Sequence, residues 1–211
     1  MPRVRNTTPL ERREQRLGVV NTLLLPLARG ARQAARLTRL LNGKHRVLHI
    51  DQTRDYTVTV AVVDMPLGNP LVVALYTSTQ TSRPLSPSQL TKRLQRLREA
   101  VEKLRNSLYT QADTVYMLYA PRGLTRGAAK KAYKAGITVA TKPIQLAKSL
   151  ARFLKARYEK LRHRLAGKRV WGPIPALLYT LHELAKSLGA DPQPPISLEQ
   201  ALHLAENGGH L

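Results

Sequence analysis

The stretch that decides the fold is YTVTVAVVDMPLGNPLVVALY, residues 56–76. Thr alternates with Val through much of Tyr56–Val63, and Leu71–Tyr76 is an apolar run, so both segments are predicted strands. The segment MPLGNP at 65–70 contains Pro and Gly, which mark a turn. Because such a short connection joins antiparallel strands, the two runs predict a β-hairpin near the middle of the chain.

Further elements extend this hairpin in both directions. A short apolar strand at Arg46–Ile50 precedes it and completes a three-stranded antiparallel meander. After it, Ser86-Pro87 opens a helix with leucines at alternating steps of four and three. A strand at Asp113–Ala120, a helix from about 125 to 135 and a short strand at Gly136–Ala140 follow. The predicted fold is therefore α/β, with a mixed five-stranded sheet made of the meander followed by α-β-α-β.

Helical segments flank this sheet at both ends of the chain. Thr8-Pro9 supplies an N-cap and a first-turn proline, and the helix is expected to kink or break at Pro26 and to resume as far as Asn42-Gly43. Pro143 begins an amphipathic helix that ends near Gly167, and two shorter helices follow. The predicted organisation is a flexible basic arm at 1–7, N-terminal basic helices at 8–43, an α/β core at 44–141 and a C-terminal helical region at 142–211.

Basic residues far outnumber acidic ones. The chain has 211 residues, with 35 Lys and Arg against 13 Asp and Glu, which gives a formal charge of +22. The net charge is +9 over 1–46, +7 over 47–141, +9 over 142–169 and −3 over 170–211. A thermophile-like charged surface normally balances its cations with Glu, which this chain does not. Because arginine exceeds lysine by 23 to 12, bidentate phosphate contacts are favoured.

Composition also excludes several classes of protein. The absence of cysteine rules out a disulfide framework, a Cys-ligated zinc and an iron–sulfur cluster. The apolar stretch Leu17 to Ala28 is too short to cross a bilayer. We therefore expect nucleic acid as the partner, DNA in preference to RNA, and no membrane. The expected location is cytoplasmic, nucleoid-associated or virion-internal, and a homo-oligomer is left open.

Three groups of cations are candidates for phosphate contact. Four arginines spaced by 3, 4 and 3 residues share one face of the first helical region and form a stripe without interleaved acids. The loop RGLTRG at 122–127 offers glycines, a capping Thr and a helix N-terminus. The helix after Pro143 has a basic face. The predicted nucleic-acid-binding residues are Arg29, Arg32, Arg36, Arg39, Arg122, Thr125, Arg126, Lys130, Lys131, Lys148, Arg152, Lys155 and Arg162.

The order of the elements resembles that of the ribonuclease H-like superfamily, especially its RuvC-type and PIWI-type domains. The matching stretches are VLHIDQTRDYTVTVAVVD at 47–64 and ADTVYMLYAPRGLTRGAAKKAYKAGITV at 112–139. The resemblance implies two Mg²⁺ ions held by an acid at the end of the first strand and by further acids, one of them on the fourth strand. Asp51 matches the first acid, whereas Tyr116–Tyr119 contains none and Asp113 is the nearest. If the chain were an active nuclease, its catalytic residues would be Asp51, Asp55 and Asp113, with Asp51 as the metal ligand.

The chain also resembles the restriction-endonuclease-like fold, in which a helix precedes the three strands. That fold carries an acid-x-lysine signature on its third strand, here VVALYTSTQ at 72–80, which places Ala74 and Tyr76 at the signature positions. Both resemblances therefore imply a nuclease-like core without its full catalytic set. The expected function is sequence-independent binding of duplex DNA, architectural or packaging, without catalysis and without a cofactor. The alternatives are an active Mg²⁺-dependent nuclease or junction resolvase and an RNA-bound structural component, such as a ribosome-associated protein.

Overall fold

The computed structural model describes residues 8–40, 49–52, 56–67, 69–78, 83–108 and 112–211. At its centre is a mixed β-sheet in which β1 and β2 are antiparallel, β2 and β3 are antiparallel, and β4 and β5 continue parallel to β3. The α/β class, the mixed sheet and the antiparallel meander are thus confirmed. The strands lie side by side in chain order: β1 (His49–Gln52), β2 (Thr57–Val63), β3 (Leu71–Thr77), β4 (Asp113–Tyr119) and β5 (Thr138–Ala140).

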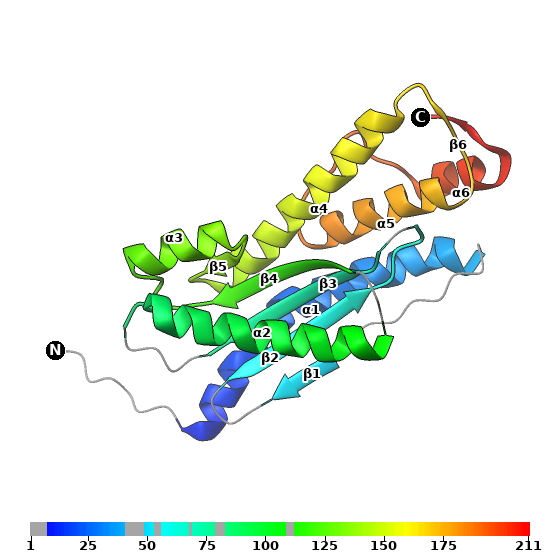
Figure 1. Ribbon diagram of the computed structural model, residues 1–211. Helices are drawn as coiled ribbons and strands as arrows, with labels where there is room; N and C mark the ends of the chain where they lie inside the picture. The colour runs from blue at the N-terminus through cyan, green and yellow to red at the C-terminus, as the bar shows by residue number, and fades with distance from the viewer. Residues whose placement is uncertain (1–7, 41–48, 53–55, 68, 79–82, 109–111) are drawn as a thin grey trace.

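Helices cover both faces of this sheet. In Figure 1, α2 crosses in front of the strands and α1 lies behind them. One face packs against α2 (Pro87–Leu108) and α3 (Arg126–Lys134). The other packs against α1 (Pro9–Leu40) and α4 (Pro143–Leu165). α5 (Pro173–Ser187) packs against α1 and α4, and α6 (Leu198–Asn207) packs against α5.

Because helices cover both faces of the sheet, the strands at its centre are apolar on both sides. Every residue of β2 and β3 is buried, because successive side chains point alternately to the two helical layers. Val58, Val60 and Val62 belong to the core beneath α2, whereas Ala61 and Val63 belong to the core beneath α1. The crossovers from β3 to β4 and from β4 to β5 step in the same direction, and right-handed connections of that kind place α2 and α3 on the same face.

The first helix is longer than the sequence predicted. α1 continues through Pro26 from Pro9 to Leu40, so a break at this proline, which the sequence allowed beside a kink, does not occur. Leu23, Leu24 and Leu27 on either side of the proline are buried in the core that α1 shares with the sheet and α5. This burial offsets the hydrogen bond that a proline removes from a helix.

The C-terminal region adds a small sheet that the sequence did not predict. β6 (Arg169–Val170) pairs antiparallel with β7 (Gly209–His210). Strands of two residues have no detectable periodicity, so no pattern could indicate them. The predicted arm at 1–7, the predicted C-cap at Asn42-Gly43 and the first three residues of the predicted strand Arg46–Ile50 lie outside the described residues.

Candidate functional site

Three helices begin at the same edge of the sheet, which we call the helix-start edge. α2, α3 and α4 follow the carboxyl ends of β3, β4 and β5, and these ends point the same way because the strands are parallel. Figure 1 shows the three helix starts, together with the start of α1, at the left end of the molecule. None of the first turns of α2, α3 and α4 contains an acid. The partial positive charges of three helix N-termini therefore gather on one edge.

Side chains cap each of these helix starts. The backbone N–H of Ser86 donates to Gln89 Oε1 at 3.0 Å before α2. Thr125 Oγ1 accepts from the Ala128 N–H at 3.4 Å at the start of α3. Before α4, Gln145 Oε1 accepts from the Thr141 N–H at 3.1 Å. The predicted capping role of Thr125 is thus confirmed.

The loop before α3 is hydrogen-bonded to the segment that precedes α2. The N–H of Leu85 donates to the Gly123 carbonyl and the N–H of Thr125 donates to the Leu85 carbonyl, both at 3.0 Å. Gly123 has a φ of 72°, a conformation that favours glycine. A Cβ at Gly127 would lie 3.3 Å from Pro87 Cγ, so the two helix starts are in close contact.

Four cations lie on this loop and on the first turns of α3. Arg122, Arg126 and Lys130 are exposed or partly exposed. Lys131 is exposed as well, but its Nζ donates to Thr91 Oγ1 of α2 at 2.6 Å, so it joins the two helices. Between described residues, none of these four cations forms an ion pair.

A cluster of two tyrosines and two arginines lies between α2 and the helix-start edge of the sheet. The rings of Tyr56 and Tyr76 are stacked, with centroids 5.1 Å apart and planes 15° apart. The Arg96 guanidinium carbon lies 4.2 Å from the Tyr56 ring centroid, and that of Arg93 lies 5.2 Å from the Tyr76 ring centroid. Arg96 Nη1 also donates to the Tyr76 hydroxyl at 3.3 Å. We call these four residues the Arg–Tyr cluster.

Burial changes the acid–base properties of this cluster. Desolvation raises the pKa of the Tyr76 phenol above its ordinary value, although the charges of Arg93 and Arg96 oppose the change. Desolvation lowers the pKa of the Arg93 guanidinium, and the charge of Arg96 also lowers it. Because the guanidinium stays charged in proteins, the cluster keeps two positive charges one helical turn apart.

Several buried polar atoms on α1 and β2 have no hydrogen-bond partner among the described residues. Arg16 is only 4% exposed, and its Nε has no hydrogen-bond partner among the described residues; the same is true of the buried Nε of Arg12. Thr57 and Thr59 on β2 have buried hydroxyls that likewise meet no partner in the described part of the chain. Arg16 precedes Val19 and Val20 by three and four residues, and both valines pack in the core that α1 shares with the sheet. Arg16 therefore lies on the sheet-facing side of α1.

The predicted arginine stripe lies further along the same helix. Arg29, Arg32 and Arg36 are exposed or partly exposed, whereas the side chain of Arg39 lies outside the described part. Arg32 Nε donates to the Ala28 carbonyl and Arg36 Nη1 to Gln33 Oε1, each at 3.3 Å. At 1.5 Å per residue, Arg32 is about 30 Å from Arg12 along α1. The stripe is therefore a separate surface from the helix-start edge.

The basic face of α4 is divided between exposed and paired cations. Lys148 and Arg152 are exposed in the first half of the helix. Lys155 pairs with Glu159 at 3.6 Å. Arg162 Nη1 donates to the Tyr158 hydroxyl at 3.3 Å. Of the four predicted cations on this face, Lys155 and Arg162 thus have partners within α4.

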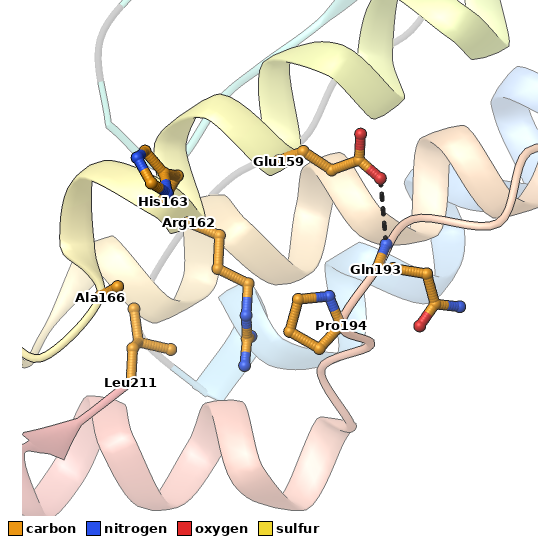
Figure 2. Close-up of a pocket in the computed structure, with 7 residues that line it drawn as sticks. All are labelled: Glu159, Arg162, His163, Ala166, Gln193, Pro194 and Leu211. Carbon is orange, nitrogen blue, oxygen red and sulfur yellow. Dashed lines mark hydrogen bonds between the residues drawn. The ribbon is translucent and has the colours of Figure 1, made fainter.

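Arg162 lies in a pocket at the far end of α4. The pocket has a volume of about 370 Å³ and is lined by Glu159, Arg162, His163, Ala166, Gln193, Pro194 and Leu211. Figure 2 shows Arg162 extending beside Pro194, and the Glu159 carboxylate accepting from the Gln193 N–H at 3.3 Å. Because an acid and a base line it together, this pocket has a mixed charge, unlike the helix-start edge.

The predicted acids are not brought together. Asp51 on β1 is in register with Val58, Tyr76 and Leu118 of the next three strands, whereas Asp113 lies five positions before Leu118. The backbones of these two acids are thus separated by about 14 Å across the strands and about 17 Å along them. The Asp113 carboxylate is ion-paired with Arg157. These two acids do not fit the Mg²⁺ pair that the ribonuclease H-like resemblance implies, and Asp55 lies outside the described residues.

The signature positions of the other resemblance are also occupied by non-catalytic groups. Ala74 and Tyr76 both point into the core beneath α2, and Tyr76 belongs to the Arg–Tyr cluster. Tyr56, Arg93 and Arg96 were not predicted as site residues. The spacing of three between Arg93 and Arg96 was visible, but their meeting with two strand-end tyrosines depends on the packing of α2.

Comparisons with family models, with curated proteins and with solved structures gave no match to this chain. In the described part of the chain, no set of three or more His, Asp or Glu side chains is grouped as a metal site would require.

Among the described helices, none combines the length and the apolar character that crossing a membrane requires.

Proposed function

We propose that this protein binds the phosphate backbone of nucleic acid at the helix-start edge, with duplex DNA as the favoured form and without catalysis. The observation that carries the proposal is the uncompensated positive charge of that edge. Three helix N-termini without first-turn acids meet there, and Arg122, Arg126 and Lys130 form no ion pair with a described carboxylate. Helix N-termini and arginines are the groups that bind phosphate oxygens.

The arrangement favours contact with the backbone over contact with bases. Aromatic residues make up only 5% of the chain, so few surfaces are available for stacking unpaired bases. The stacked face of Tyr56 is covered by Tyr76, and Arg96 lies over its ring. Binding through phosphates is independent of sequence, which fits an architectural or packaging role.

The arginine stripe on α1 supplies a second contact surface. Arg29, Arg32 and Arg36 reach solvent along one helix. Like charges on neighbouring turns repel one another, and a bound polyanion relieves this repulsion. We propose that the stripe contributes affinity and that the compact loop at 122–127 positions the protein on the backbone.

A salt titration tests the proposal. The affinity for a fluorescein-labelled duplex of about 20 base pairs is measured by anisotropy at increasing salt. Log K is expected to fall linearly with log salt, at about 0.9 per phosphate contacted, and equally for unrelated sequences. A flat response would remove backbone binding as the function. Parallel titrations with single-stranded DNA and duplex RNA test the preference for duplex DNA.

The same mixtures test the absence of catalysis. Because Asp51 and Asp113 lie at opposite ends of the sheet, we expect no cleavage of duplex or junction DNA in the presence of Mg²⁺ or Mn²⁺. Cleavage that disappears in Asp51→Asn would instead establish the nuclease alternative.

A further inference from the structure

We infer that Arg93 and Arg96 form a binding site for one phosphate group and that Tyr56 and Tyr76 hold the two guanidinium groups in place for it. The inference deepens the proposed function, on which it rests, by assigning a phosphodiester of the nucleic-acid backbone to a named pair of side chains. It adds to the helix-start edge a site on the body of α2.

The geometry fixes both arginines before any ligand arrives. Arg96 is held by a cation–π contact with Tyr56 and by a hydrogen bond to the Tyr76 hydroxyl. Arg93 lies over the Tyr76 ring. The tyrosines are themselves stacked, and Tyr76 is buried in the core beneath α2. An arginine fixed in this way loses less conformational freedom on binding than an unrestrained one, which favours affinity.

The cluster has hydrogen-bond donors and positive charge in excess of its acceptors. Arg93 Nη1 is buried without a hydrogen-bond partner among the described residues, a situation that is rare for a guanidinium nitrogen. Arg93 and Arg96 lie one turn apart and repel each other. Neither forms an ion pair with a described carboxylate, and Glu99 on the next turn accepts from Gln95 Nε2 at 2.9 Å. A doubly charged cluster in which the Arg96 side chain is exposed is suited to an anion with several oxygen acceptors.

The ligand is a phosphate rather than a base. The ring of Tyr56 is stacked on Tyr76 and contacts the Arg96 guanidinium, so an inserted base would have to compete with these two contacts. Phosphate oxygens accept bidentate hydrogen bonds from guanidinium groups.

The test compares two arginines of the same helix. Arg96→Gln removes a charge from the cluster, and Arg98→Gln removes the same charge from an exposed position about 200° around α2. In the duplex anisotropy assay, Arg96→Gln is expected to lower affinity about tenfold and the salt slope by about one unit. Arg98→Gln is expected to change affinity less than about twofold, because it removes charge without a phosphate contact. Thermal unfolding followed by circular dichroism verifies that both variants are folded.

A third variant tests whether the position of the two arginines matters in addition to their charge. Tyr56→Leu keeps both arginines but removes the stack, so affinity is expected to fall about threefold while the salt slope stays unchanged. If Arg96→Gln and Arg98→Gln bind the duplex equally well, the inference is wrong while the proposed function stands.

A second measurement separates the nucleic-acid backbone from free phosphate. The Nε–Hε resonances of Arg93 and Arg96 are followed by NMR during addition of the duplex and, separately, of inorganic phosphate. Shifts with the duplex at far lower concentration support the phosphodiester assignment. Shifts with inorganic phosphate and no binding of duplex would overturn the proposed function and the phosphodiester assignment and leave an anion site. No shift of either resonance with either ligand would overturn the inference.

Discussion

Glu183 on α5 shows how one hydrogen bond lowers the pKa of a partly buried acid. Its carboxylate lies 3.1 Å from His182 Nδ1. This bond lowers the pKa of Glu183 below its ordinary value of 4.5, although burial opposes the change. Because the folded-state pKa is lowered, the stabilisation is fully present above the unfolded-state pKa and is lost as pH falls through the folded-state pKa.

Replacing this acid tests the effect. Glu183→Gln should lower the free energy of unfolding by about 1 kcal/mol at neutral pH, and the difference from wild type should vanish in acid. Urea unfolding between about pH 3 and pH 7, the range in which a carboxyl group titrates, measures both quantities. Glu206→Gln, which changes an exposed acid on α6, is the control. An unchanged difference between wild type and Glu183→Gln across that pH range would contradict the assignment.

The residues of the candidate site were predictable only where a local pattern marks them. The cap at Thr125 and the solvent-facing cations Arg122 and Arg126 follow from the sequence of one loop. Asp113 illustrates the opposite case, because its partner Arg157 is 44 residues away and nothing local indicates the ion pair. The Arg–Tyr cluster depends in the same way on how α2 packs on the sheet.

At the scale of elements, the contact between α1 and α5 is controlled by one glycine. A Cβ at Gly30 would lie 2.5 Å from Ser187 Oγ and 2.8 Å from the Glu183 carbonyl oxygen. The backbone contact leaves no room for a methyl group, so the two helices would have to separate. A Cβ at Gly18, in the same helix, would meet no heavy atom of another described element within 4 Å.

These two glycines give a matched pair of variants. Gly30→Ala should lower the free energy of unfolding by about 1–3 kcal/mol through overpacking. Gly18→Ala should raise it by about 0.5–1 kcal/mol, since alanine is the better helix former. Chemical denaturation of both proteins provides the comparison. Equal effects of the same sign would show that the close approach of α1 to α5 is wrong.

The arginine stripe is also a property of an element, because it requires a continuous helix. Changing Arg32 and Arg36 together to Gln should weaken binding to every duplex sequence alike and lower the salt slope by roughly two units. Stability should be unchanged or slightly higher, since two repelling charges are removed. Anisotropy and thermal unfolding measure the two effects. If affinity and slope stay at the wild-type values, the exposed cations at Lys148 and Arg152 become the first alternative.

Much of the fold was predictable because its elements have strong periodic patterns. The alternation in Tyr56–Val63 and the leucine spacing after Ser86-Pro87 both correspond to observed elements, β2 and α2. The continuity of α1 through Pro26 was not predictable, because burial of the neighbouring leucines against the sheet and α5 outweighs the local preference of proline. Local patterns thus indicated the elements, and long-range packing decided where one of them continued.

At the scale of the whole molecule, acidic and basic charge are distributed unevenly over the fold. The acidic surplus over 170–211 coincides with α5 and α6, which pack around the core on the side of α1 and α4. The helix starts that carry the uncompensated charge lie at the left end in Figure 1, away from α6. Under the proposed function, this uneven charge favours binding of a polyanion at the helix-start edge.

The unbroken α1 also joins the elements on its side of the sheet into one cooperative unit. It runs from the helix-start edge, across the sheet, to the layer formed by α5. Its buried side chains belong to the same core as those of β3, α4 and α5. Because removal of α1 would expose the rest of that core, the helix cannot detach as an independently unfolding arm. A protease that cuts the buried part of α1, between Val19 and Leu37, would therefore have to wait for global unfolding rather than for a local opening.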